Sequence, residues 1–352
     1  MWNVIGHERV VLALAQSVKD GKLAHAYLFT GPQGIGKMTL AMQLACALNC
    51  LADGKPCGAC AQCKRILDGK HADVQVVGLG GDGEETQKEI SIKQVEALQE
   101  MASLAPFEGA HRVFIIENAE LLNVNAANRL LKTLEEPPAQ VCILLLSREP
   151  AKLLPTIVSR CRVYDLRSVP EQAITDALMK LHGTDKERAR ELARLSEGRI
   201  GWALAAAQNP AVEETRRDLV DEAVELIESG YVERLQLAGR MAQDFSRRRE
   251  ESYEALALLR RLWRDALLLK GGSPQAVVNA DRRDMLERMT GSLTLAELAG
   301  AIRETESAIA RLQLNANPRL TLETFALNLP LVKAAEPAPT GRPAAEPEAE
   351  QV

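Results

Sequence analysis

The sequence predicts an α/β protein in which a parallel sheet covered by helices precedes a small helical domain and a longer all-α region. Three observations support this prediction. Strand and helix patterns alternate up to about residue 166, strand patterns stop near residue 168, and aromatic residues make up only 3% of a chain rich in Leu and Ala. A length of 352 residues suffices for two or three domains, each with its own core.

Apolar runs and helical periodicities place the elements of the first region. Strands are predicted at residues 26–29, 73–77, 113–116 and 141–146. Helices are predicted at residues 8–19, 38–48, 92–104 and 126–134. Strands that alternate with helices in this way form a parallel sheet with helices on its faces.

The remainder of the chain has only helical patterns. Capping boxes are predicted at residues 168–171, 184–187 and 294–297, and Asn209-Pro210 is a candidate domain boundary. We expect four parts: a sheet domain with a cysteine-rich insert (50–63), a helical domain, a second helical domain and a disordered tail rich in Ala, Pro and Glu. Their ranges are 1–166, 167–208, 209–333 and 334–352.

Charge and apolar patterning narrow the class of protein. The formal net charge of -5 argues against a broad basic surface for nucleic acid, so any DNA contact must be local or shared with partner chains. No run of 18 apolar residues occurs, and the first residues lack the pattern of a signal peptide. We therefore expect a cytoplasmic protein without a membrane partner.

A glycine-rich loop follows the first predicted strand. Residues 31–39 read Gly-Pro-Gln-Gly-Ile-Gly-Lys-Met-Thr and open the helix at 38–48, a context in which backbone N–H groups cradle phosphates. Met38 stands where a hydroxyl should hold Mg²⁺, and Thr39 points about 100° around the helix from it. A glycine-rich turn that binds nothing is the alternative. The candidate nucleotide-binding residues are Gly31, Gly34, Ile35, Gly36, Lys37, Met38 and Thr39.

Glu117 and Asn118 end the strand predicted at 113–116. An ATPase of this plan needs an Asp there to hold Mg²⁺, followed by a Glu that polarises the attacking water. Glu117 has the length to reach a metal, but the carboxamide of Asn118 has no basic lone pair near neutral pH and cannot act as a general base. We expect a degenerate Mg²⁺ and water site, with solvated polar residues at a strand end as the alternative.

Four of the seven cysteines form a C-x6-C-x2-C-x2-C cluster: Cys50, Cys57, Cys60 and Cys63. Four thiolates at this spacing suit a closed tetrahedral Zn²⁺ site, which would fold a segment too short to bury a core. Because sulfur would fill every coordination position, such a zinc ion would be structural. An iron–sulfur cluster and free thiols are the alternatives, although no further Cys-Pro follows the cluster.

Five segments of the chain resemble the sequence motifs of a known family, and they occur in the same order. They are residues 25–31, the cysteine cluster, and residues 128–137, 154–161 and 315–320. Together they resemble the bacterial clamp-loader family of DNA polymerase III, and within it the delta-prime type of subunit, over about residues 1–332. The resemblance implies an AAA+ module with a RecA-like domain and a helical lid. It also implies a helical collar that joins five subunits in an open ring.

In that family the arginine of Ser159-Arg160-Cys161 is a finger inserted into the ATP site of the neighbouring subunit. The resemblance therefore implies that Arg160 contacts the γ-phosphate bound there and offsets charge that develops in phosphoryl transfer. Pro155 and Thr156 would fix the turn that aims this side chain.

The chain departs from the motor subunits of the family at four places. Besides Met38 and the pair Glu117-Asn118, the lid reads Gly198-Arg-Ile-Gly201 where motors carry Gly-Ser-x-Arg, so the sensor arginine is absent. Ser147-Arg148 also replaces a small polar pair at the end of the preceding strand. Parts of the hydrolysis machinery are thus altered while the finger is intact.

These features predict a stator-like subunit of the DNA polymerase III holoenzyme that has no ATPase activity of its own. Its expected partners are motor subunits of gamma or tau type, a delta-type subunit, the sliding clamp and primed DNA inside the ring. Two alternatives remain: a motor ATPase of the same loader, and a regulatory module that binds ATP or ADP without cleaving it. ATP turnover by the isolated chain, and a nucleotide titration with and without Mg²⁺, distinguish them.

Overall fold

A computed structural model describes residues 2–79 and 89–332. The chain divides into two compact units, Met1–Pro210 and Ala211–Val352, and each is described by itself. The tail expected at 334–352 lies outside the described residues. No helix in the described ranges is long and apolar enough to cross a membrane.

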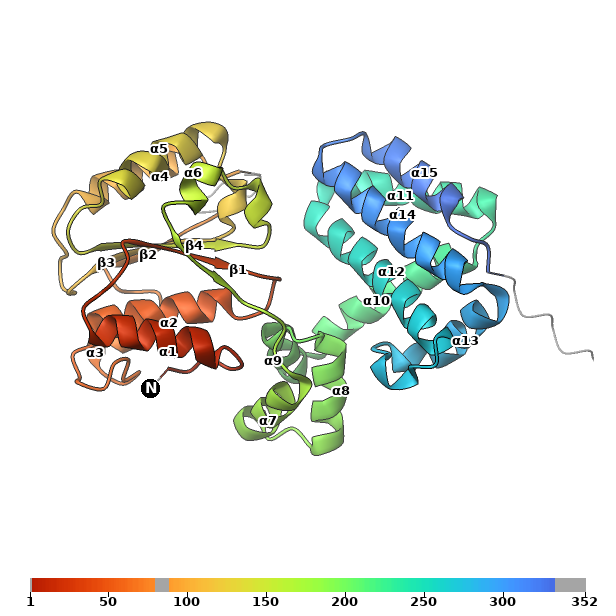
Figure 1. The fold of residues 1–352 in the computed structure, drawn as a ribbon, viewed down its shortest axis with the longest axis horizontal. Helices are drawn as coiled ribbons and strands as arrows, with labels where there is room; N and C mark the ends of the chain where they lie inside the picture. Colours follow the sequence, from red (N-terminus) through yellow and green to blue (C-terminus); the bar gives the residue numbers. More distant parts are fainter. Residues whose placement is uncertain (1, 80–88, 333–352) are drawn as a thin grey trace, which may run out of the picture. The chain divides into compact units, whose positions relative to one another are not determined.

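The first unit is built on a five-stranded sheet in which all paired strands are parallel (Figure 1). Across the sheet the order is β2 (Val74–Val77), β3 (Arg112–Ile116), β4 (Val141–Ser147), β1 (Ala26–Thr30) and β5 (Arg162–Asp165). The side chains of β1, β3 and β4 are buried throughout, as expected for strands covered on both faces. The candidate phosphate loop, residues 31–39, follows β1, so it lies at the carboxyl edge of the sheet.

Helices cover both faces of the sheet (Figure 1). One face carries α1 (Glu8–Lys19), α2 (Lys37–Asn49) and α3 (Ala61–Leu67), and the other carries α4 (Ile92–Ala102), α5 (Val124–Glu135) and α6 (Pro155–Val158). The short 3₁₀ helices η1 (Ala119–Leu121) and η2 (Pro150–Lys152) follow β3 and β4. On the second face, alternate residues of β1, β3 and β4 form one apolar core with α4 and α5. Because successive side chains of a strand point to opposite faces of the sheet, each layer of helices packs against its own set of strand side chains.

Three further helices complete this unit: α7 (Glu171–His182), α8 (Lys186–Ser196) and α9 (Ile200–Gln208). Gly183 ends α7 in a left-handed conformation, with φ of 64°. Two predicted capping boxes are wrong in detail. Pro170, not Ser168, precedes α7 without a side-chain cap, and Asp185, not Thr184, caps α8 by accepting hydrogen bonds from two backbone N–H groups. Asp competes well for this position because its short carboxylate reaches those groups.

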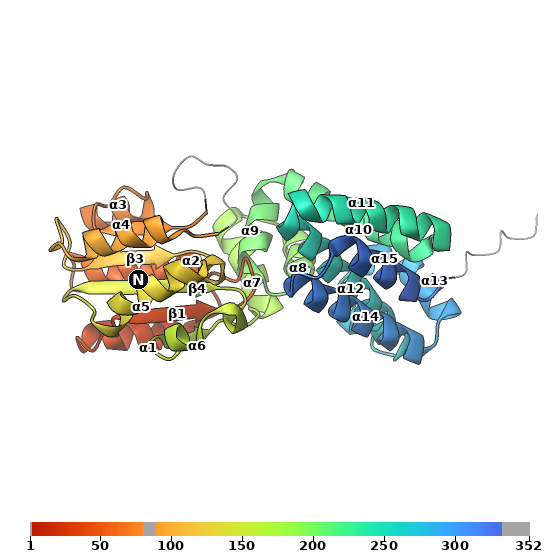
Figure 2. The same ribbon diagram turned by 90° about the horizontal axis from the view of Figure 1, so that it is seen from above.

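The second unit is entirely helical in its described part (Figure 2). It contains α10 (Pro210–Glu228), α11 (Tyr231–Arg247), α12 (Arg249–Lys270), η3 (Pro274–Ala276), η4 (Ala280–Arg282), α13 (Arg283–Ser292), α14 (Leu295–Gln313) and α15 (Pro318–Asn328). The predicted capping box of Thr294 and Glu297 is confirmed at the start of α14. One apolar core around Trp263 joins these helices.

Arg234 is a fully buried cation in the second unit, with an exposed fraction of 0%. Its guanidinium donates to the carbonyl oxygens of Leu226 (3.1 Å) and Ile227 (2.8 Å) at the end of α10, and of Leu329 (2.6 Å) and Pro330 (2.8 Å) after α15. The last carbonyls of a helix lack partners within the helix, so a buried end needs such a donor. Arg234 therefore joins the ends of α10 and α15.

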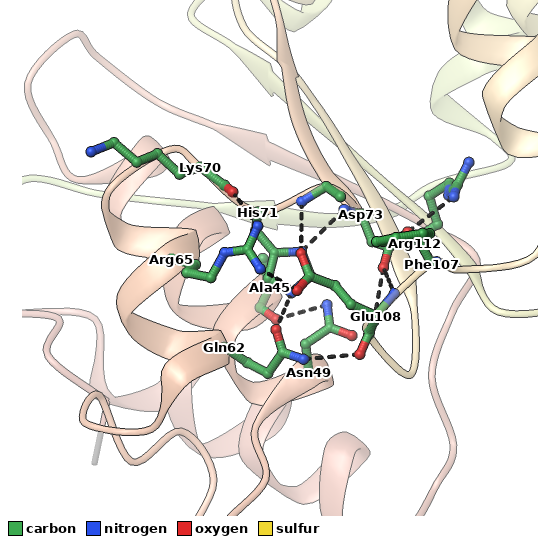
Figure 3. Close-up of polar contacts among 12 residues, drawn as sticks. Ala45, Asn49, Gln62, Arg65, Lys70, His71, Asp73, Phe107, Glu108 and Arg112 are labelled. Carbon is green, nitrogen blue, oxygen red and sulfur yellow. Dashed lines mark hydrogen bonds and ion pairs between the residues drawn. The ribbon is translucent and has the colours of Figure 1, made fainter.

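Asp73 holds the opposite, amino edge of the sheet together (Figure 3). Its carboxylate, 0% exposed, accepts hydrogen bonds from the backbone N–H groups of Phe107 (2.7 Å), Glu108 (2.7 Å) and Gly109 (2.8 Å), and from Arg112 (3.0 Å). Burial alone would raise its pKa, but these donors outweigh burial and hold the pKa below its usual 3.8. The loop before β3 is thereby ordered.

The cysteine insert is attached to this ordered loop through Glu108 (Figure 3). Gln62 of α3 donates to the Glu108 carbonyl (2.9 Å) and contacts the ring Nε2 of the buried His71 (2.6 Å), while Arg65 of α3 forms an ion pair with the Glu108 carboxylate. At the end of α2, Asn49 accepts from the His111 N–H (2.8 Å). Side chains of the insert thus fix its position against the sheet.

Replacing Asp73 by Ala is expected to destabilise the first unit by about 3–5 kcal/mol, because the buried Arg112 loses its counter-charge. Since the pKa of Asp73 is depressed, its stabilising effect is present above pH 3.8 and is lost as pH falls below that value. Denaturant unfolding across this pH range measures both effects. The exposed Asp68→Ala is the control, and equal stability of the two variants would contradict the assigned role.

Candidate functional site

The phosphate loop connects β1 to α2 in a conformation that requires glycine. Gly31 has φ of 136°, and a Cβ atom there would lie 2.4 Å from the Leu166 carbonyl oxygen. Gly36 has φ of 108° and precedes the first turn of α2. The Gly31 N–H donates to the Ser147 carbonyl at the end of β4 (3.2 Å). The predicted strand, loop and helix are therefore present, with the loop against the ends of the neighbouring strands.

Lys37 is turned toward its own loop. Its ammonium group donates to the carbonyl oxygens of Gly31 (2.5 Å) and Pro32 (2.8 Å). Burial, and then the nearby positive charge of Arg148, lower the pKa of Lys37 to about 8, although Glu120 and Glu117 oppose the shift. The loop lysine thus shares its site with a second cation.

Arg148 joins the phosphate loop to the end of β3. Its guanidinium donates to the side-chain oxygens of Gln33 (3.0 Å) and Asn118 (3.2 Å), and its backbone N–H donates to the carboxylate of Glu120 (3.1 Å). Asn118 adopts a left-handed conformation, with φ of 52°. The side-chain oxygen of Asn118 is thereby occupied by a guanidinium.

The residues of the predicted degenerate Mg²⁺ site lie at the start of α2 and directly after β3. Met38 occupies the first turn of α2, and Thr39 on the same turn is exposed to solvent. The Glu117 side chain lies beside Gly78, where a Cβ atom would be 3.6 Å from the Cβ of Glu117. The side chain of Ile35, which belongs to the loop, is fully buried. Its backbone carbonyl contacts the His7 ring (2.9 Å). At the start of α2, Met38 thus supplies a thioether and not a hydroxyl.

Helix α9 contacts the loop at 31–39 directly through backbone atoms. The Gly201 N–H at the start of α9 donates to the Gly34 carbonyl (2.7 Å). A Cβ atom on Gly201 would lie 3.0 Å from that oxygen and 3.3 Å from the Gly34 Cα, which is tighter than ordinary contact. Glycine at position 201 therefore lets α9 approach the loop.

Arg160 lies apart from this loop, after the short helix α6. It is 34% exposed, and donates to the carboxylate of Glu135 (2.6 Å) and to the carbonyl of Thr156 (3.0 Å). Pro155 occupies the first position of α6, where its fixed φ suits a helix start. The structure thus places Arg160 on a short, well-defined turn and does not bring it to Lys37.

The four predicted cysteines come together. Their Sγ atoms all lie within 4.8 Å of one another, and those of Cys57 and Cys63 are 4.0 Å apart. A tetrahedral zinc ion with bonds of about 2.3 Å needs sulfur atoms about 3.8 Å apart, so the four residues fit such an ion. Backbone N–H groups of Ala59 and Cys60 lower the pKa of Cys57 to about 6, which favours the thiolate that binds metals. The cluster could bind a metal ion such as zinc.

The sequence matches proteins of one family. The family model described as "DNA polymerase III, delta subunit" matches residues 6–170. DNA polymerase III subunit delta′ of Bacillus subtilis (strain 168) is 30% identical over 324 residues, which cover 91% of this chain and 95% of that protein. The chain belongs to the DNA polymerase III delta′ family. The predicted membership of the clamp-loader family is therefore confirmed. The predicted α/β fold class, a parallel sheet followed by helices, is confirmed as well.

Other relatives resemble part of this delta′ family member. DNA polymerase III subunit tau of Bacillus subtilis is 32% identical over 191 residues, which cover 54% of this chain and 33% of tau. The Escherichia coli (strain K12) tau subunit is 34% identical over 210 residues, 58% of this chain and 32% of tau. A gamma subunit-related protein from Thermotoga maritima has a solved structure with 18% identity and a TM-score of 0.43, covering 90% of this chain and 97% of that one.

Three side-chain contacts in this delta′ family member were not predicted from the sequence. They are the contact of Arg148 with Gln33, the contact of Arg148 with Glu120, and the ion pair of Arg160 with Glu135. The sequence singled out Arg148 because it replaces a small polar residue of the motor subunits. Its hydrogen-bond partners Gln33 and Glu120 belong to other segments of the chain. The predicted parallel sheet was the one signal for these contacts, because parallel pairing of β3, β4 and β1 brings the carboxyl ends of the strands to one edge.

Replacing Arg148 by Ala is expected to raise the pKa of Lys37 above about 8, because the positive charge that helps burial to lower this pKa is removed. The pKa should stay below 10.5 since burial persists. The pH dependence of Lys37 acylation, followed by peptide mass spectrometry, measures it. An Arg190→Ala variant, altered on the exposed face of α8, is the control. An unchanged acylation profile in Arg148→Ala would contradict the contact.

Proposed function

We propose that this chain is a stator-like, non-hydrolysing subunit of the DNA polymerase III clamp loader. It supplies Arg160 as an arginine finger to the ATP site of a neighbouring motor subunit during loading of the sliding clamp on primed DNA. The observation that carries the proposal is that Arg160 and the residues of the chain's own loop lie in different surroundings. Arg160 is partly exposed at the end of α6, whereas Lys37 and Arg148 are engaged within the chain's own loop.

The chain's own loop is poorly suited to phosphoryl transfer. Hydrolysis needs a bound Mg²⁺ and a group that orients water, and the residues at those positions are Met38 and Asn118. The Asn118 side chain contacts Arg148, and Gly201 brings the lid backbone to the loop without a sensor side chain. These features support the absence of ATPase activity in this chain.

A second function has one specific observation in its favour. The glycines at 31 and 36 keep the conformations of a phosphate loop, and two cations, Lys37 and Arg148, lie beside it. This arrangement favours a module that binds ATP or ADP without cleaving it, because positive charge and helix N–H groups attract phosphate. A motor ATPase is the less favoured alternative, since it requires the Mg²⁺ ligand and the base.

Assembly with other loader subunits would use the second unit. Exposed apolar side chains gather on α11 and α15, which pack against each other. They are Tyr231, Val232, Leu235, Leu320 and Leu327. Apolar side chains of this kind are typical of surfaces that associate with other chains. We infer that this unit is the collar at 209–333 through which gamma- or tau-type and delta-type subunits join the ring.

We infer that Cys50, Cys57, Cys60 and Cys63 hold one structural zinc ion. The ion would supply four bonds that fold the insert, while the side chains of α3 hold that insert against Glu108. With all positions filled by sulfur, it would take no part in ATP chemistry.

Replacing Cys57 by Ser is expected to reduce bound zinc from one ion per chain to a substoichiometric amount and to lower the thermal stability of the first unit, because a structural metal contributes folding free energy. Metal analysis and thermal denaturation with and without a chelator measure these effects. Cys161→Ser, outside the cluster, should keep the zinc. Full zinc occupancy in Cys57→Ser would overturn the assignment.

Replacing Arg160 by Ala in a reconstituted loader is expected to slow turnover at the neighbouring ATP site by at least about 10³-fold, the usual contribution of an arginine finger. Arg160→Lys should not restore it, because an ammonium group lacks the planar fork of donors. DNA-stimulated ATPase and clamp-loading rates are measured. The control is Arg167→Ala, at an arginine whose side chain is 88% exposed. Unchanged rates for Arg160→Ala would sink the proposal.

A further inference from the structure

Glu135 is the acidic partner of Arg160, and its role rests on the finger proposed above. It is the last residue of α5, and its carboxylate accepts a hydrogen bond of 2.6 Å from the guanidinium of Arg160, 25 residues further along the chain. Its side chain is 50% exposed. The two elements meet because α5 packs against α6.

The guanidinium of Arg160 is held at two points. Besides Glu135, the carbonyl of Thr156 accepts from its second terminal nitrogen (3.0 Å), and the same carbonyl accepts from the Ser159 hydroxyl (3.1 Å). An arginine has five N–H donors in a rigid plane. Within the described part of the chain, the other three donors of Arg160 have no protein acceptor. The two contacts therefore orient the guanidinium, and three of its N–H donors remain available to an external anion.

Helix stability does not explain an acidic residue at this position. Glu135 ends α5 and Glu136 follows it, but the carboxyl end of a helix carries partial negative charge and favours cations. The Glu135 side chain is also half exposed, so burial against the core is not its main role. Arg160 compensates the unfavourable charge, and an exposed ion pair of this kind stabilises a fold only weakly. The pair is thus better suited to orient a side chain than to hold the fold.

We propose that Glu135 is a positioning residue, which together with the Thr156 carbonyl orients the Arg160 guanidinium for the ATP site of the neighbouring subunit. A flexible arginine loses rotamer entropy when it binds a phosphate group, and prior orientation reduces that loss. Because the ion pair is exposed and weak, a polyanionic triphosphate is able to compete with one carboxylate for the guanidinium. Glu135 acts through Arg160 and does not itself contact the nucleotide.

A double-mutant cycle in the reconstituted loader tests this role. The variants are Glu135→Gln, Arg160→Ala and the two combined, and the matched control is Glu136→Gln at the neighbouring exposed glutamate. Glu135→Gln is expected to lower the kcat of DNA-stimulated ATP hydrolysis at the neighbouring site by about 3- to 5-fold, the range of one exposed ion pair. The KM for ATP and the melting temperature of the isolated chain should stay unchanged. In the Arg160→Ala background, Glu135→Gln should have no further effect.

The outcomes separate this inference from the function on which it rests. If Arg160→Ala leaves ATPase activity unchanged, both the finger and its positioning residue are overturned. If Arg160→Ala is impaired but Glu135→Gln is not, or if Glu135→Gln is as harmful without Arg160 as with it, the finger stands and the role of Glu135 is wrong. A loss of melting temperature in Glu135→Gln equal to its loss of activity would also overturn it, because it would indicate a structural role.

Discussion

The parallel pairing of β1 between β4 and β5 is the constraint on which the site depends. In this register Thr30 lies opposite Ser147 on one side and Asp165 on the other, so three strands end at the same level. The phosphate loop after β1 therefore meets Arg148 after β4, and Gly31 approaches the Leu166 backbone after β5. Glycine at position 31 follows from this crowding, because a side chain would collide with a carbonyl group.

The same edge explains why the loop at 31–39 needs glycine. The glycines serve the close approach of backbone segments, a demand that remains whether or not nucleotide is bound. Around the loop, polar side chains contact one another, as the hydrogen bond from Arg148 to Asn118 illustrates. Arg160 belongs to a different surface, formed by the ends of α5 and α6. The loop and the surface that carries Arg160 are therefore structurally separate.

Much of the fold was predictable because burial imposes a period on each segment. The helix at 8–19 and the buried strands β1, β3 and β4 agree with their apolar patterns to within one or two residues. β5 was missed because it is an edge strand with three exposed residues among four, and its identity comes from pairing with β1. Cys57 and its three companions were predictable because short spacing limits how far apart they can lie.

The sequence by itself determined the loop, the cysteine cluster, the arginine of Ser159-Arg160-Cys161 and the absence of a magnesium hydroxyl at Met38, since each depends on residue type and local spacing. Only the tertiary structure decided what those residues contact. Arg148 and Gln33 are 115 residues apart, and Arg160 and Glu135 are 25 residues apart on different elements. Such contacts arise from strand register and helix packing, which depend on the whole sheet and are not encoded in any local pattern.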